Sequence, residues 1–153
     1  MTEHPADWLV SPELAPSFEG TALAPLFEHA ERGELAMPFC AECAEPFELD
    51  QEVCDRCTGT GAHWRPVPPS GVVHARTLVH RTASPLLRTT APYPVLDVEL
   101  DSAHRVVMTT LEPATRDWQI GDRVRVAFRR VGGVPVPAAV PTGDTDPTKE
   151  EPA

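Results

Sequence analysis

The second half of the chain contains short stretches in which apolar and polar residues alternate. In residues 123–129 three apolar side chains alternate with arginines, and in residues 96–101 three alternate with acidic residues. Alternation with a period of two is typical of a strand that buries one face and exposes the other. Pro, Gly and Asp residues separate five β-rich stretches, at residues 72–80, 95–100, 105–111, 123–129 and 134–140. Five short strands within about seventy residues favour a small five-stranded barrel of the OB type.

One segment of the first half has the pattern of a short amphipathic helix. Apolar residues recur at helical spacing from Leu23 to Ala30, and Gly33 follows as a stop signal. Because Pro25 is tolerated only in the first turn of a helix, we expect the helix to begin near Ala22.

All four cysteines follow this helix within eighteen residues, as two C-x-x-C pairs. A C-x-x-C turn presents two thiolates from one tight loop, and zinc prefers four tetrahedral ligands. Ten residues separate the pairs, which is enough for a short hairpin that brings them together. We therefore predict a zinc ribbon that holds one structural Zn²⁺ ion, with no ligand position left open for catalysis. The predicted ligands are Cys40, Cys43, Cys54 and Cys57.

Other uses of the same residues stay open. The cysteines could form two redox dithiols or two disulfides, or bind iron in a tetrahedral four-sulfur site. His63 is close enough in sequence to replace a cysteine, although with four thiolates present it is better interpreted as a surface histidine. The start of the chain has no basic segment and no apolar run of signal-peptide length, so we expect a cytoplasmic protein with no membrane contact. Thiols stay reduced in that compartment, which favours the metal site.

The two ends of the chain show no periodicity. Residues 1–17 are rich in Pro and acidic residues, and residues 141–153 contain no large apolar side chain. Segments of this composition cannot bury enough apolar surface to fold. The sequence thus predicts a flexible arm at 1–17, the helix plus zinc ribbon at 18–66, the OB-fold at 67–140 and a disordered tail at 141–153.

The net charge of −10 is unevenly distributed. Residues 1–64 hold thirteen acidic residues against two arginines, whereas residues 65–130 hold six against ten. Affinity for nucleic acid comes chiefly from neutralised phosphates, so the acidic first half argues against binding along a polyanion. The basic middle segment could still hold one compact anion.

Several short motifs occur in an order that resembles the DUF35 family. They are Gly33-Glu34-Leu35 after the helix, the paired C-x-x-C, Trp64, Ser70-Gly71-Val72, Thr77, Ala91-Pro92-Tyr93-Pro94 and Ile120-Gly121-Asp122-Arg123-Val124. The resemblance covers residues 18–137 and implies a rubredoxin-like zinc ribbon joined to an OB-fold. Members of this family are typically small non-catalytic partners of thiolase-fold enzymes. The resemblance therefore implies an accessory subunit of a hetero-oligomeric thiolase, aldolase or acyltransferase that acts on acyl-CoA thioesters.

The chain departs from the family pattern at three places. Ala44 stands where the family often has a glycine, and only Gly71 represents a frequent Gly-x-Gly. Residues 134–137, Val-Pro-Val-Pro, replace an aromatic residue near the last strand. The last departure argues against a private ligand pocket in this chain.

The resemblance to acyl-CoA proteins gives the basic residues an interpretation. Coenzyme A carries phosphates, and arginine is suited to bidentate phosphate contact. The alternative is that these arginines are simply solvated. In the loop at residues 81–94, two leucines need either a partner or internal packing to cover them. The candidate contacts to CoA or to the partner are Arg76, Arg81, Leu86, Leu87, Arg88, Tyr93, Arg129 and Arg130. The amphipathic helix is a second candidate docking surface.

We expect no catalysis by this chain alone. Its four cysteines are assigned to the metal, and no nucleophile elbow or phosphate-binding glycine loop is present. His74, His80 and His104 lie on or beside predicted strands without a recognisable carboxylate partner in sequence. Two other functions stay open: a single-stranded nucleic-acid-binding protein and a free-standing acyl-CoA binder.

Overall fold

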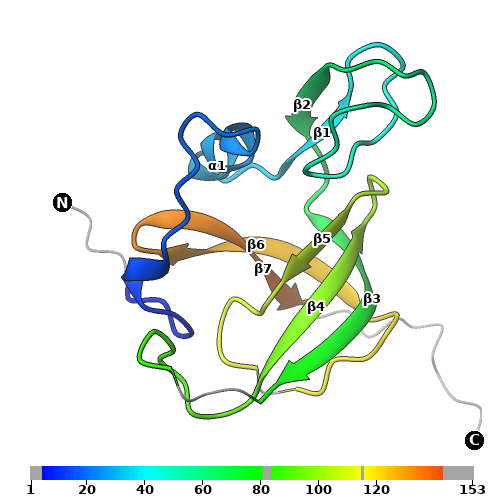
Figure 1. Ribbon diagram of the computed structural model, residues 1–153. Coiled ribbons are helices and arrows are strands. Elements are labelled where there is room, and N and C mark those ends of the chain that lie inside the picture. Colours follow the sequence, from blue (N-terminus) through cyan, green and yellow to red (C-terminus); the bar gives the residue numbers. More distant parts are fainter. Residues whose placement is uncertain (1–4, 81–83, 115, 143–153) are drawn as a thin grey trace, which may run out of the picture.

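The computed structural model describes residues 5–80, 84–114 and 116–142. Arg81 and residues 143–153 of the expected tail lie outside these ranges. The elements are η1 (Pro12–Leu14), α1 (Ala24–Glu31), β1 (Ala36–Cys40), β2 (Ala62–Pro66), β3 (Ser70–Val79), β4 (Tyr93–Leu100), β5 (Arg105–Met108), β6 (Arg123–Val131) and β7 (Val134–Pro141). Figure 1 shows α1 and the β1–β2 pair above the five remaining strands. No helix among the described residues is long and apolar enough to cross a membrane.

The five C-terminal strands form an antiparallel sheet that curls into a nearly closed barrel. The strand order is β5-β4-β3-β6-β7. A parallel bridge between Thr110 and Ala139 joins the two ends of the sheet. The amide of Ala139 also donates to the Thr109 carbonyl at 2.9 Å. The predicted fold class is confirmed: a mainly β chain in which a short helix and a cysteine-bearing ribbon precede a five-stranded OB-fold barrel.

The alternating pattern selects which face of each strand turns inward. Val124 and Val126 of β6 are buried whereas Arg123 and Arg125 are exposed. Each buried valine or leucine gains about 1.5–3 kcal/mol by leaving water, so the register is strongly specified.

The chains of β3 and β4 approach closely at Gly71, where an added Cβ would overlap the backbone of Glu99. This contact explains why a glycine is required at the start of β3.

Helix α1 covers the barrel with its apolar face. Leu26, Phe27 and Ala30 are buried, and α1 contacts β7 and β1. The ring of Phe18 stacks on Phe27 at a centroid distance of 4.7 Å. The helix begins at Ala24, slightly later than expected, with Pro25 in its first turn. Since the apolar face of α1 packs internally, it is not free for docking.

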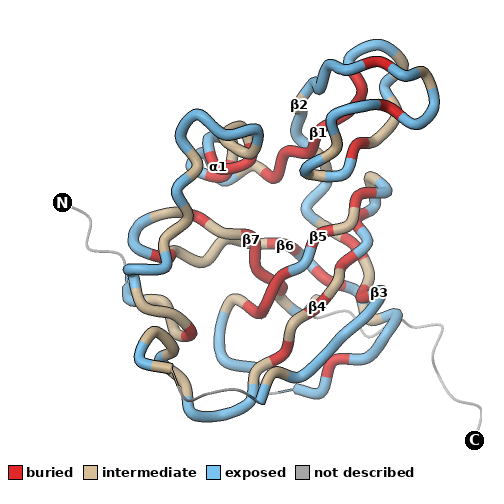
Figure 2. The backbone as a smooth tube through the Cα atoms, viewed as in Figure 1, coloured by how far each residue is buried: buried red, intermediate tan, exposed pale blue. Residues whose placement is uncertain are grey.

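Strand β1 connects the ribbon to the barrel. All five of its residues are buried, as the red segment between α1 and β2 shows in Figure 2. Met37 belongs to the same apolar cluster as the barrel residues Val98 and Val124. The ribbon therefore shares the core of the barrel through one strand.

His104 makes a second connection between ribbon and barrel. It is 3 % exposed, its Nε2 lies 2.7 Å from the Pro38 carbonyl oxygen and its Nδ1 lies 2.8 Å from the Ser102 hydroxyl. Burial lowers the pKa of His104, so the imidazole is neutral near pH 7, with Nε2 donating to Pro38. The ring also packs edge-on against Phe39 at 4.9 Å.

The structure differs from the flexible arm expected at residues 1–17. Residues 7–12, which we call the N-terminal strap, lie along the barrel. Leu9 is 4 % exposed, and Val10 forms a β-bridge with Leu87. The apolar run at residues 8–10 gives this segment a buried side that its overall composition conceals. The domain boundaries inferred from the sequence otherwise stay predictions.

Replacing His104 with alanine should loosen the contact between ribbon and barrel. The change leaves the buried Pro38 carbonyl without its donor, and an unsatisfied buried polar group costs about 1–3 kcal/mol. We expect the free energy of unfolding, measured by urea denaturation of the metal-loaded chain, to fall by an amount in this range. His104→Gln, whose amide can still donate, should lose less. Equal stability of the alanine variant and the unchanged chain would contradict the role assigned to His104.

Candidate functional site

The two C-x-x-C turns have the same backbone geometry. The amide of Ala44 donates to the Cys40 carbonyl at 2.9 Å, and the amide of Thr58 donates to the Cys54 carbonyl at the same distance of 2.9 Å. The amides of Cys40 and Cys54 each donate to the carbonyl five residues ahead, at 2.8 Å. This repeated turn aims both cysteines of each pair at one point.

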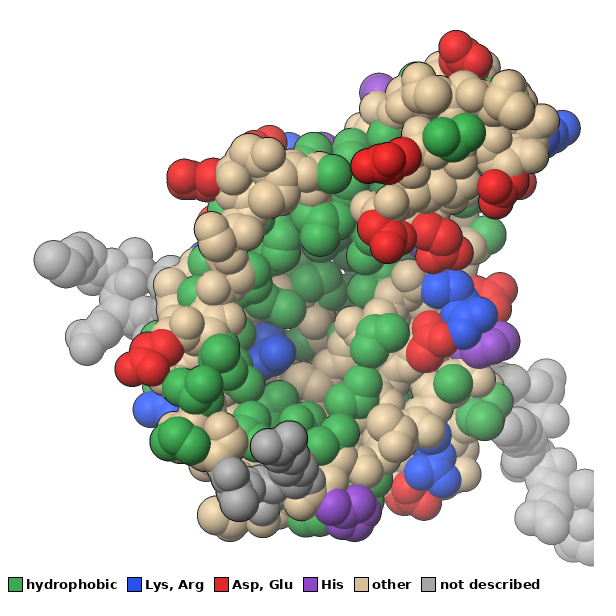
Figure 3. All heavy atoms as spheres, in the orientation of Figure 1, with side chains coloured by type: hydrophobic (Ala, Val, Ile, Leu, Met, Phe, Trp, Pro, Cys, Tyr) green, Lys and Arg blue, Asp and Glu red, His purple; other side chains and the backbone are tan. Residues whose placement is uncertain are grey.

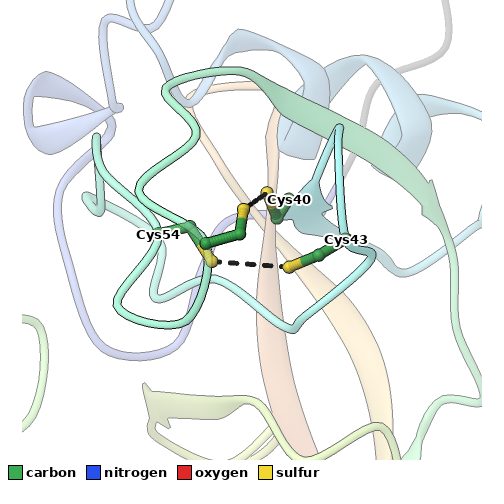
Figure 4. Close-up of side chains that lie close together, drawn as sticks. Cys40, Cys43 and Cys54 are labelled. Carbon is green, nitrogen blue, oxygen red and sulfur yellow. Dashed lines mark hydrogen bonds between the residues drawn. The ribbon is translucent and has the colours of Figure 1, made fainter.

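The four sulfur atoms form one compact cluster. Its members, Cys40, Cys43, Cys54 and Cys57, have their Sγ atoms all within 4.8 Å of one another. Cross-turn sulfur pairs lie at 3.5 Å (Figure 4). A disulfide would require about 2.05 Å, and the cysteines are free. A tetrahedral ion with about 2.3 Å bonds separates its sulfur ligands by about 3.8 Å, so the cluster fits one metal ion.

The protonation of the thiols favours a cation at this point. The backbone amide of Cys43 lowers the pKa of Cys40 to about 7. Although the Gly59 amide lowers the pKa of Cys57, the hydrogen bond with Cys40 and burial outweigh it and raise that pKa to about 12. Closely spaced sulfurs thus resist ionising together, whereas a bound metal ion allows all of them to be thiolates.

The predicted hairpin between the cysteine pairs is wrong. Residues 44–53 form no strand, and only Pro46 makes an isolated bridge, to Phe39. Strand β1, which ends at Cys40, pairs with β2 after the second cysteine pair. Phe47, 2 % exposed, inserts beneath the sulfur cluster. The connection between the two cysteine pairs thus places an apolar side chain against the cysteines.

His63 lies outside the cluster. It is exposed on β2 and faces Phe39 in the strand register. The cluster of potential ligands around the two turns consists of the four cysteines.

The remaining histidines of interest are separated in the structure. The His74 Nδ1 lies 3.6 Å from a Glu99 carboxylate oxygen on the neighbouring strand, with both side chains about half exposed. His80 is exposed at the end of β3. His104 is committed to Pro38 and Ser102. The carboxylate partner of His74 was not recognisable in sequence because it comes from another strand.

Most of the predicted contact residues gather around the strap. Leu87 pairs with Val10, the Arg88 amide donates to the Leu9 carbonyl at 2.8 Å, and Tyr93 packs edge-on against Trp8. Leu86 accepts a hydrogen bond from the Ser11 amide at 2.8 Å. The strap thus pairs with the backbone of the loop, whose two leucines are half-buried.

Carboxylates neutralise most of the candidate arginines. The ion pairs are Arg129–Asp7 at 2.7 Å, Arg130–Glu31 at 3.1 Å and Arg76–Asp117 at 3.6 Å. Arg76 lies away from the strap, in a separate depression of about 100 Å³ beside Trp118. Among the described candidates, Arg88 alone has no carboxylate partner, and its side chain donates to the Asp7 carbonyl at 3.3 Å.

Two surface pockets flank the strap. One, of about 520 Å³, is lined by Arg88, Arg130 and the Gly132-Gly133 turn. The other, of about 500 Å³, is lined by Trp8, Phe128 and Arg129. Figure 3 shows the face between α1, the ribbon and the barrel as a hollow lined mainly by hydrophobic side chains. The molecule therefore offers an apolar depression with basic groups at its edge.

Comparison with known proteins identifies the barrel. Residues 64–129 match the family model described as "ChsH2, C-terminal OB-fold domain". A solved structure described as "Ltp2-ChsH2(DUF35) aldolase" matches with a TM-score of 0.70 and 22% identity, over 82% of this chain and 98% of that chain. At this identity the structural match shows a shared fold. The search of curated proteins found no match. The family match, the fold and the four-cysteine cluster confirm the resemblance to the DUF35 family.

Sequence reasoning missed the residues that organise the strap. Asp7 and Trp8 were assigned to a flexible arm, yet the side chain of Asp7 is 2% exposed and the Trp8 indole donates to the Thr110 carbonyl at 3.1 Å. The apolar run that begins at Trp8 was the available signal. Its partners are more than 70 residues away, as in the Arg88–Asp7 contact at a separation of 81.

Replacing Cys54 with serine should abolish metal binding. The change removes one of four thiolate ligands, and a structural zinc contributes roughly 10–16 kcal/mol of apparent binding energy that is also folding energy. We expect metal analysis to show loss of stoichiometric zinc and thermal unfolding to occur at a lower temperature. Val53→Ser, which alters an exposed neighbour, should change neither. Full zinc content in the Cys54 variant would refute the assignment.

Replacing Ala44 with glycine should stabilise the ribbon. Ala44 has a φ of 62°, a left-handed conformation that costs an L-residue about 1–2 kcal/mol. Part of this gain is lost because glycine is more flexible in the unfolded chain. We therefore expect the free energy of unfolding to rise by about 0.5–1 kcal/mol. Ala41→Gly, in the same turn without a positive φ, should instead lower it; equal effects of both changes would contradict this explanation.

Proposed function

We propose that this chain is a non-catalytic, zinc-stabilised accessory subunit that docks on a thiolase-fold enzyme acting on acyl-CoA thioesters. The observation that carries the proposal is the match of residues 64–129 to the ChsH2 C-terminal OB-fold. It is supported by the fold shared with a DUF35 chain described as part of an aldolase with Ltp2. The DUF35 resemblance supplies the thiolase-fold class of the partner.

The metal centre supports a structural role for zinc. Four sulfur ligands complete a tetrahedral site and leave no position for a substrate. The cysteines Cys40 and Cys54 are buried, 2% and 1% exposed, which suits an ion that holds a fold together. Zinc is the ion we assign, with iron as the alternative for the same geometry. Free thiols of this kind also favour a cytoplasmic location.

Binding of the CoA ester, if shared with the partner, is best placed beside the strap. Arg88 lacks a carboxylate partner among the described residues and lines one pocket with Arg130. Arg76 and Arg129 are weaker candidates for phosphate contact because Asp117 and Asp7 already compensate their charge. Because Glu31 also pairs with Arg130, we place CoA contact chiefly on Arg88.

Binding of single-stranded nucleic acid is the less favoured function. It requires exposed aromatic side chains along a basic groove. Trp118 is 2% exposed, Phe128 packs against the core cluster, and Tyr93 lies half-buried against Trp8. The paired arginines further weaken the positive field that nucleic acid would need.

Affinity capture of the tagged, zinc-loaded chain from its native lysate tests the function. We expect mass spectrometry to find a thiolase-fold protein in near-stoichiometric amount. Arg88→Glu reverses a charge within the proposed contact surface and should reduce recovery at least tenfold. Arg125→Glu makes the same charge change at an exposed position near the start of β6, away from the strap. This control should leave recovery unchanged.

The other outcomes separate the alternatives. Capture of no enzyme, together with tight binding of a CoA ester by the isolated chain in a titration, would identify a free-standing binder. Capture of nucleic acid that survives moderate salt would replace the proposal with the nucleic-acid function.

A further inference from the structure

We propose that the N-terminal strap is an exchangeable internal ligand. It occupies a groove of the barrel that binds an extended partner segment with a carboxylate followed by an aromatic residue. This inference rests on the proposed function for the identity of the partner class, and it concerns how that partner is received. The groove consists of residues 86–88, the start of β4 and the end of β6.

The backbone of the strap pairs with residues 86–88 through one isolated antiparallel bridge. The amide of Arg88 donates to the Leu9 carbonyl and the amide of Ser11 donates to the Leu86 carbonyl, both at 2.8 Å. Val10 and Leu87 form an antiparallel bridge between these two bonds. Bonds of this kind are made to main-chain atoms, so any extended segment can form them.

The side chains of the strap define what the groove recognises. Asp7 places its carboxylate 2.7 Å from the guanidinium of Arg129. Trp8 packs edge-on against Tyr93 at a centroid distance of 6.5 Å, and its indole donates to the Thr110 carbonyl. The groove thus offers a cation for a carboxylate and an aromatic wall with an acceptor for the next residue. A partner segment with this pattern is complementary in charge and shape.

The strap fits this groove incompletely. The Asp7 Oδ2 accepts hydrogen bonds from the Leu9 and Val10 amides as well as from Arg129. The Asp7 Oδ1 and the Arg129 Nε are buried without a hydrogen-bond partner among the described residues. Burying an ion pair is favourable only when its remaining polar atoms are also satisfied. Asp7 also stands between the two pockets, whose walls it shares. Space on both sides and unpaired polar atoms within the contact make the strap replaceable by a better-fitting segment.

Exchange of the strap would expose the predicted contact residues. The backbone of residues 86–88 is paired with the strap, so a partner segment can pair with it only after the strap leaves, whereas the Arg88 side chain is exposed already. Residues 13–23 connect the strap to α1, and Gly20 in this connection has a φ of 73°. Phe18 of this connection stacks on Phe27 of α1, which gives the chain an attachment to the helix that does not depend on the strap.

A peptide titration on the full, zinc-loaded chain tests this inference without any partner enzyme. The probe is a fluorescein-labelled peptide with the sequence of residues 5–14, followed by fluorescence anisotropy. Asp7→Asn weakens the resident strap, so we expect this variant to bind the probe at least tenfold more tightly than the unchanged chain. A probe with asparagine in place of its aspartate should lose at least tenfold in affinity. Asp50→Asn, an exposed change in the ribbon, should behave as the unchanged chain does.

Hydrogen exchange on the unchanged chain provides a measurement that does not depend on a variant. The amides of residues 9–11 should exchange at least tenfold faster than those of Val124 and Val126 in the barrel core. The inference is overturned if the strap amides are as protected as these core amides. It is also overturned if the Asp7 variant, folded by circular dichroism, fails to bind the probe or binds phosphate or CoA there but no peptide. Failure of the capture experiment with a positive peptide result would reject the enzyme partner alone.

Discussion

The crowding of four thiols at one point is the constraint on which the N-terminal module depends. The buried apolar side chain that packs against Cys40 and Cys54 is Phe47. So small a core cannot stabilise two loops and a strand pair by itself. A metal ion held by the four cysteines would supply that stability, because it allows all four sulfurs to be thiolate ligands. The repeated turn of the two C-x-x-C pairs brings their four sulfur atoms close enough to share one metal ion.

The ribbon is nevertheless not an independent body. Strand β1 contributes Met37 to the barrel core and ends at Cys40 of the sulfur cluster, so the two parts share one strand. His104 adds a polar connection from the β4–β5 turn to Pro38. Loss of the metal would therefore disturb the edge of the barrel as well as the ribbon. This coupling suits a subunit that presents one rigid surface to a partner.

Ion pairs formed on folding change the surface charge that the sequence suggests. The sequence shows a basic middle and an acidic beginning, which invites the interpretation of an anion-binding surface. Folding brings acidic residues of the first half to arginines of the second, as in Asp7–Arg129 and Glu31–Arg130. Much of the apparent positive surface is thereby neutralised, and the basic groups that remain available, such as Arg88, are few and local.

The sequence by itself determined the elements whose cause is local. The period of two along residues 123–129 predicts a strand with an inner and an outer face, and the spacing of the cysteines predicts a four-thiolate site; both patterns act within a few residues of the chain. Tertiary structure alone decided which partners the strap, His104 and the arginines contact. Trp8 meets Thr110, and Pro38 meets His104, across sequence separations of 102 and 66 residues. Contacts at such distances arise from the closure of the barrel and leave no periodic trace in the sequence. For the same reason, composition described residues 1–17 as a flexible arm, although the barrel provides a groove that holds residues 7–12.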